Sequence, residues 1–87
     1  MQISVELTMY PFNGDYIPPI KGFIEKLNTI TGLTTQTFPT ATIMMGDYDL
    51  VMDSLKMLLR WSQETHGKAV FVAKFLPNST VLESAPN

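Results

Sequence analysis

Apolar and polar residues alternate near the start of the chain, which is the pattern of a strand with one buried face. The apolar face carries Ile3, Val5, Leu7 and Met9. The opposite, mixed face carries Ser4, Glu6, Thr8 and Tyr10. Residues 11–15 follow with Pro, Asn, Gly and Asp, which favour turns. The pattern therefore predicts a strand over residues 3–10.

Two later segments place apolar residues at helical spacing. The first is expected to begin near Pro18 and Pro19, which suit a helix start, and to end at Gly32 as a left-handed cap. Its apolar stripe is Ile20, Phe23, Ile24, Leu27 and Ile30. The second helix is expected to begin at Asp47 as the N-cap and to end at Gly67. Its stripe is Leu50, Val51, Leu55, Leu58 and either Trp61 or Ser62.

Three further strands complete the pattern. Residues 33–38 are rich in Thr and predict an edge strand, whereas the more apolar residues 41–45 suit a central one. Residues 69–75 are apolar on both faces except at Lys74. The order strand, helix, strand, strand, helix, strand favours an α+β, ferredoxin-like βαββαβ sandwich. Its antiparallel four-stranded sheet has strands one and three at the centre and two helices on one face. We expect a single domain over residues 1–78 and a polar tail over 79–87.

Composition narrows the partners. Of the 87 residues, 45% are hydrophobic and 16% are charged, so the small surface is unusually apolar and suggests an oligomer. The apolar fourth strand, residues 69–75, would lie at a sheet edge, which invites pairing with another copy in a homodimer or homotetramer. A net charge of −2 without a basic run excludes an electrostatic footprint for nucleic acid. No apolar stretch is long enough for a membrane span and no signal-peptide pattern is visible, so we expect a cytoplasmic protein.

Few residues are suited to catalysis. Cysteine is absent, and the single histidine, His66, lies at a helix end where it would favour the negative pole of the helix dipole. Asp47 and Asp49 suit the start of a helix, and no spacing predicts a metal site. The only arginine, Arg60, lies within the second helix rather than in an anion-binding loop. We therefore expect no catalytic residues, no metal and no cofactor.

The mixed face of the first strand is the remaining candidate for function. A carboxylate in a central strand is costly to bury without a partner, so Glu6 either pairs with a lysine such as Lys74 or contributes to a binding surface. In the second interpretation, Tyr10 forms an aromatic wall and several side chains are polar anchors: Glu6, Thr8, Thr35, Thr37 and Thr42. The strand register decides which of them share a face.

Several segments resemble the YkoF-like family of thiamine/hydroxymethylpyrimidine-binding proteins. They are residues 7–12, 15–17, 20–21, 40–46 and 50–52, and the likeness extends over most of residues 3–76. Its most specific element is the strand exit Met9-Tyr10-Pro11, followed by the acidic-aromatic pair Asp15-Tyr16. Tyr10 and Thr42 match residue types of the family, whereas Glu6 departs from it.

The resemblance implies a ferredoxin-like fold that binds thiamine or hydroxymethylpyrimidine without changing it. The known family member carries two such repeats, so a homodimer of this single repeat would replace the tandem pair. Two other functions stay open. One is a small dimeric α+β-barrel enzyme of the monooxygenase or isomerase kind, which an enclosed Glu6 would favour. The other is a regulatory interaction domain without a ligand.

Overall fold

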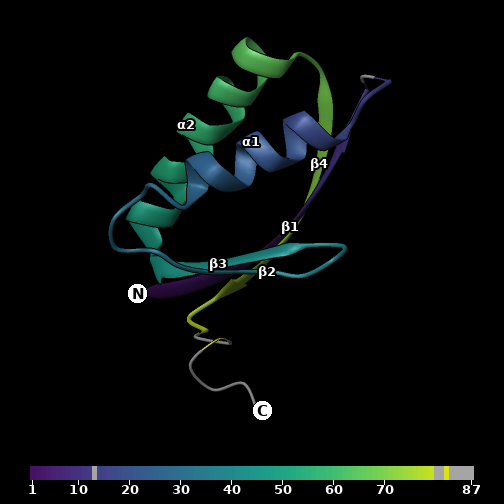
Figure 1. Ribbon diagram of the computed structural model, residues 1–87. Coiled ribbons are helices and arrows are strands. Elements are labelled where there is room, and N and C mark those ends of the chain that lie inside the picture. Colours follow the sequence, from purple (N-terminus) through teal and green to yellow (C-terminus); the bar gives the residue numbers. More distant parts are fainter. Residues whose placement is uncertain (13, 80–81, 83–87) are drawn as a thin grey trace.

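Two helices cover one face of an antiparallel sheet in the computed structural model, which describes residues 1–12, 14–79 and 82 (Figure 1). The elements are β1 (Gln2–Pro11), α1 (Ile17–Leu27), β2 (Thr34–Thr37), β3 (Thr42–Asp47), α2 (Tyr48–His66) and β4 (Ala69–Pro77). The strand order is β2-β3-β1-β4, with β1 and β3 at the centre. The predicted α+β, ferredoxin-like fold is confirmed. The tail expected over residues 79–87 lies outside the described residues, apart from Ser79 and Leu82.

The strand register fixes which side chains face the helices. Val5 lies opposite Met44 of β3 and opposite Phe75 of β4. The alternation then directs one face of β1 toward α1 and α2, where burial of each large apolar side chain stabilises the fold by about 1.5–3 kcal/mol. The buried core comprises Ile3, Val5, Leu7, Phe23, Leu27, Met44, Val51, Leu55 and Leu58.

Helix α1 ends earlier than the sequence predicted, at Leu27 instead of near Gly32. The backbone N–H groups of Thr29 and Ile30 donate to carbonyls three residues back, at 3.1 Å in each case. The Thr29 hydroxyl also donates to the Lys26 carbonyl at 2.7 Å. These short-range bonds and the β-branched Thr29 and Ile30 favour termination here. Gly32, with a φ of +96°, serves the turn into β2 instead of capping the helix.

Helix α2 begins and ends where the sequence indicated. The Asp47 carboxylate accepts hydrogen bonds from the backbone N–H groups of Asp49 and Leu50 at 3.1 and 3.3 Å, as an N-cap does. Gly67 follows the last turn with a φ of +86°. Of the two alternatives for the last stripe position, Ser62 is buried, whereas Trp61 lies partly exposed with its ring edge-on to His66.

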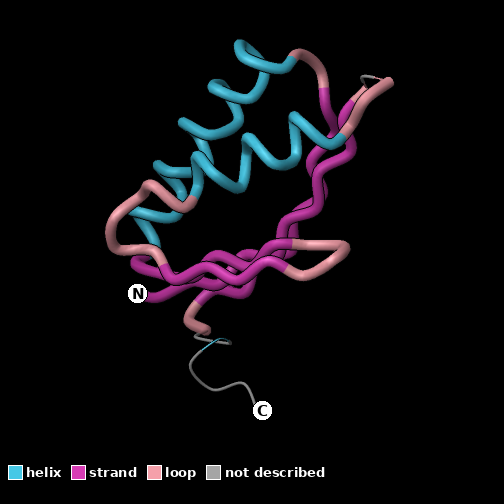
Figure 2. The backbone as a smooth tube through the Cα atoms, viewed as in Figure 1, coloured by secondary structure: helices cyan, strands magenta, loops and turns pink. Residues whose placement is uncertain are grey.

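Strand β4 is a long edge strand that pairs with β1 from Ile3↔Pro77 to Pro11↔Ala69. Figure 2 shows the two strands running together beyond the shorter β2–β3 hairpin. Several of its apolar side chains are exposed: Val70, Val72, Phe75 and Leu76. Ser4 and Met45, which lie opposite each other in the register, are buried on the sheet face away from the helices. The Ser4 hydroxyl donates to the Ser79 carbonyl at 2.9 Å.

Candidate functional site

A cavity of about 430 Å³ opens between the first half of α1, the end of β1 and the β2–β3 hairpin. This volume lies within the range of small-molecule sites, about 300–1,000 Å³. Strand β1 contributes Leu7, Thr8, Met9, Tyr10 and Pro11 to the lining. The start of α1 contributes Tyr16, Ile20, Phe23 and Ile24. The hairpin contributes Thr37, Phe38, Pro39, Thr40, Ala41 and Thr42. The cavity thus lies beside β1, at the end where β3 stops pairing with it, and side chains from both faces of β1 contribute to its lining.

The inner part of the cavity belongs to the core. Leu7 and Phe23 are buried members of the core cluster. Thr42 lies directly opposite Leu7 in the register and is 7% exposed, so its hydroxyl is a polar group in an apolar wall. The Thr37 hydroxyl, on the next strand, lies 3.4 Å from that of Thr42. This pair offers hydrogen bonds to a ligand that reaches the inner wall.

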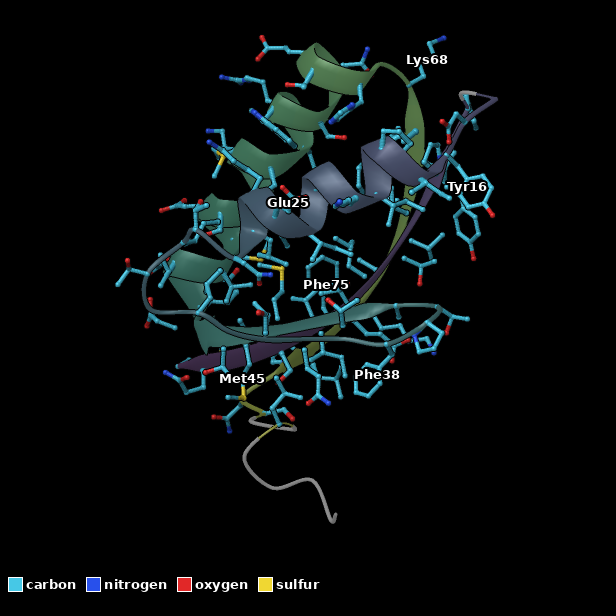
Figure 3. All side chains as sticks on the ribbon, viewed as in Figure 1. Tyr16, Glu25, Phe38, Met45, Lys68 and Phe75 are labelled. Carbon is cyan, nitrogen blue, oxygen red and sulfur yellow. The ribbon has the colours of Figure 1, made fainter. Side chains whose placement is uncertain are left out.

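Aromatic side chains form the outer part. Tyr10, Tyr16 and Phe38 line the cavity and are 56%, 58% and 43% exposed. They come from the end of β1, the residue before α1 and the hairpin turn. Figure 3 shows Tyr16 and Phe38 on the same side of the molecule, Tyr16 above and Phe38 below. An aromatic ring that enters between these elements would find both flat apolar faces and hydroxyl groups.

Two hydrogen bonds to backbone carbonyls fix the hairpin turn, one within the turn and one from β1. The Phe38 N–H donates to the Ala41 carbonyl at 2.7 Å, which closes the turn around Pro39 and Thr40. The Thr8 hydroxyl donates to the Thr40 carbonyl at 3.1 Å. Thr8 therefore positions the hairpin turn, which supplies one wall of the cavity.

Four of the six predicted site residues line this cavity: Thr8, Tyr10, Thr37 and Thr42. The other two lie elsewhere. Glu6 is opposite Lys74 in the register, and its carboxylate forms an ion pair with the Lys74 amine at 3.6 Å on the open sheet face. The Thr35 hydroxyl donates to the Asn28 side-chain oxygen at 2.9 Å, beyond the end of α1. The structure therefore bears out the lysine partner considered for Glu6.

Sequence reasoning missed the contributions of Tyr16, Ile20, Phe23 and the turn residues Phe38 and Thr40 to this site. The helical stripe did identify Ile20 and Phe23, but only as core residues. Asp15-Tyr16 stood out in the family resemblance without an assigned role. No local pattern relates the hairpin turn to α1, because their proximity depends on how the hairpin packs.

A second, more open hollow lies along α2 beside Lys26 of α1. It is lined by Lys26, Asp53, Lys56, Met57, Arg60, Trp61 and Glu64. Charges of both signs and its openness are typical of a solvated helix surface. Among the described residues, no group of three or more His, Asp or Glu side chains is placed to hold a metal ion. Nor does the described part of the chain contain a helix long and apolar enough to cross a membrane.

Comparison with solved structures supports the fold. A Thermotoga maritima protein, provisionally described as a thiamine biosynthesis/salvage protein, superposes with a TM-score of 0.86 at 21% identity, covering 98% of this chain and 96% of that one. A Streptococcus pneumoniae protein gives a TM-score of 0.83 at 23% identity, covering 93% and 91%. A hypothetical protein from Methanocaldococcus jannaschii gives 0.78 at 17% identity, covering 95% and 91%.

No functionally curated protein matches the sequence. The model of the YKOF-related family does match it, over residues 2–79, which is nearly the whole chain. The match includes β1, α1 and the β2–β3 hairpin, and so every element that lines the cavity. The chain belongs to the YKOF-related family.

Proposed function

We propose that this protein is a non-catalytic, cytoplasmic binder of thiamine or its hydroxymethylpyrimidine half, acting in salvage, transport or buffering. The observation that carries the proposal is the cavity between α1 and the β2–β3 hairpin, with its aromatic rim and its inner pair of threonine hydroxyls. Family membership and the thiamine-related description of the Thermotoga maritima protein support the same ligand class.

The lining favours binding over chemistry. Its residues, as far as the structure describes them, are aliphatic, aromatic or hydroxyl-bearing, with proline and methionine. General acid–base catalysis uses histidine most often, and otherwise carboxylates, lysine, tyrosine or cysteine within reach of the substrate; of these residue types the described lining holds only tyrosine, at Tyr10 and Tyr16. Glu6, the carboxylate that would have suited the enzyme hypothesis, forms an ion pair with Lys74 instead of lining the cavity.

A ligand would be held by two kinds of contact. Tyr10, Tyr16 and Phe38 would face its rings, and a cationic thiazolium ring against an aromatic face contributes roughly 0.5–2 kcal/mol. The Thr37 and Thr42 hydroxyls would pair with the amino group or ring nitrogen of the pyrimidine, at about 0.5–1.5 kcal/mol for each hydrogen bond.

We further propose that two copies associate through β4. Its outer edge has no strand partner within the described chain, and its exposed Val70 and Val72 are apolar. A long, apolar, unpaired edge favours addition of another strand. A dimer or tetramer of this single repeat would then provide more than one cavity for each assembly.

The test is thermal unfolding of the purified protein with thiamine and, separately, hydroxymethylpyrimidine. A ligand at a hundredfold excess over its dissociation constant stabilises the fold by about 2.7 kcal/mol. For a small domain each kcal/mol raises Tm by about 4–8 °C, so the expected shift exceeds about 10 °C. Titration calorimetry then gives the dissociation constant of each ligand.

Two threonine variants place the site. Thr42→Val removes the inner hydroxyl with little change in shape and should weaken binding about 2- to 10-fold, the effect of one hydrogen bond. Thr34→Val makes the same chemical change on an exposed residue of β2 outside the cavity and should leave binding unchanged. Absence of any shift with both ligands contradicts the function. Loss of binding in Glu6→Gln but not in Thr42→Val would move the site to the open sheet face.

A further inference from the structure

The side chains around the cavity carry no positive charge. None of the described lining residues is a lysine, arginine or histidine. Their polar groups are the hydroxyls of Thr8, Thr37, Thr40 and Thr42 and of two tyrosines. Proteins commonly hold phosphate groups with arginine, lysine or a row of free backbone N–H groups. Arginine and lysine are both missing from the described lining.

The start of α1 also lacks free N–H groups to offer. Helix starts usually attract anions because their first N–H groups have no partner. Here the Ile17 N–H donates to the Asp15 carboxylate at 3.3 Å. Pro18 and Pro19 have no N–H, and the Ile20 N–H donates to the Tyr16 carbonyl at 3.4 Å. The helix end that faces the cavity is therefore already satisfied, by a negative side chain and by proline.

The charged side chains nearest the cavity rim do not make up for the missing positive charge in the lining. Asp15 directly precedes the rim residue Tyr16, and its carboxylate adds negative potential at the helix start. Lys21 follows the lining residue Ile20 but is exposed and outside the lining. Lys68, labelled in Figure 3, precedes β4 and lies beside the end of β1, where its carbonyl accepts from the Phe12 N–H at 3.1 Å, but it is not among the lining residues. The whole chain has a net charge of −2, which also disfavours an anion.

We infer that the cavity selects neutral or cationic ring compounds and rejects their phosphate esters. This inference rests on the proposed function and narrows its ligand to the free vitamin or free pyrimidine. A phosphate that enters the cavity loses hydration without gaining a charged partner, and one that projects from the rim approaches Asp15. The cationic thiazolium ring meets aromatic faces instead. The protein thus acts before phosphorylation of its ligand or after dephosphorylation.

The experiment compares thiamine, thiamine monophosphate and thiamine diphosphate by titration calorimetry at pH 7.5. We expect each phosphate ester to bind at least about tenfold more weakly than thiamine, which corresponds to ~1.4 kcal/mol. Equal or tighter binding of the monophosphate overturns the inference while the proposed function stands. Absence of binding by all three compounds and by hydroxymethylpyrimidine overturns the proposed function and the inference with it.

A charge-adding variant tests the physical cause. Thr40 is exposed on the hairpin turn, and its carbonyl, which Thr8 uses, is retained in any substitution. Thr40→Lys should reduce the ratio of the monophosphate to thiamine dissociation constants by about tenfold, as a new cation does near an anion. Thr40→Gln, a long but neutral side chain, should keep the wild-type ratio. Lys21→Gln should also keep it, because that lysine lies outside the lining. An equal ratio in Thr40→Lys and Thr40→Gln overturns the charge argument.

Discussion

Two buried serines show how the same side chain stabilises or destabilises according to its partners. Ser4 and Ser62 are both 0% exposed. The Ser4 hydroxyl donates to the Ser79 carbonyl, which links the first strand to the chain after the last. The Ser62 hydroxyl, on the inner face of α2, has no hydrogen-bond partner among the described residues. A buried polar group without a partner costs about 1–3 kcal/mol.

Ser62→Ala should therefore raise the free energy of unfolding by about 1 kcal/mol, because it removes an unpaired hydroxyl from an apolar setting. Ser4→Ala should lower it by about 1 kcal/mol, because it deletes a hydrogen bond that holds two ends of the chain together. Urea unfolding followed by circular dichroism measures both. If Ser62→Ala destabilises the protein as much as Ser4→Ala does, the Ser62 hydroxyl has a partner in solution.

At the scale of the element, local sequence signals predicted both ends of α2 but only the start of α1. Asp47 and Gly67 mark the two ends of α2, and the structure has both in these roles. Pro18 and Pro19 mark the start of α1 correctly, but Gly32 does not mark its end. The helix stops at Leu27 because the following Thr29 and Ile30 are β-branched and bond to carbonyls only three residues back.

The N-cap of α2 provides a test at this scale. Asp47→Ala should lower the free energy of unfolding by about 1 kcal/mol, since two N–H groups of the first turn lose their acceptor. Asp47→Asn should retain most of the stability because asparagine caps about as well. Thermal unfolding of the three proteins decides it. A loss in Asp47→Asn equal to that in Asp47→Ala would attribute the effect to charge instead of capping.

At the scale of the molecule, β4 stands out because one of its edges is unpaired within the described chain and several of its apolar side chains are exposed. It pairs on one side with β1, while its outer edge and several apolar side chains remain exposed, including Val72 at 51%. Natural edge strands usually carry charges that prevent further pairing, and β4 has only Lys74. The exposed apolar edge supports the proposal that copies of this chain pair through β4.

The double variant Val70→Lys and Val72→Lys should dissociate such an assembly, because charges on an edge strand disfavour pairing. Analytical ultracentrifugation measures the mass against the 9.8 kDa of one chain. Leu59→Lys, the same kind of change on the exposed side of α2, should leave the mass unchanged. A wild-type protein that sediments as a monomer at micromolar concentration would contradict association through β4.

The sequence by itself determined the element order, the sheet topology and most helix ends. Alternation in β1 and the stripe in α2 are local signals, and they depend on which side of one element is buried. The polar β2 and the apolar β3 indicated edge and centre, and the handedness of crossovers left few other arrangements. The sequence also resembled the YkoF-like family, and the family model confirms membership over residues 2–79.

Only the tertiary structure decided where the candidate site lies. A shift of one residue in register exchanges the two faces of a strand, and no local pattern fixes the register of Thr35, Thr37 and Thr42 against β1. The observed register puts these three hydroxyls on the helix side and leaves Glu6 beside Lys74 on the other face. The packing of the hairpin turn against α1 then brings Phe38 and Tyr16 to one cavity. Such contacts join residues that are far apart in the sequence, so no local sequence pattern predicts them and they become visible only in the folded chain.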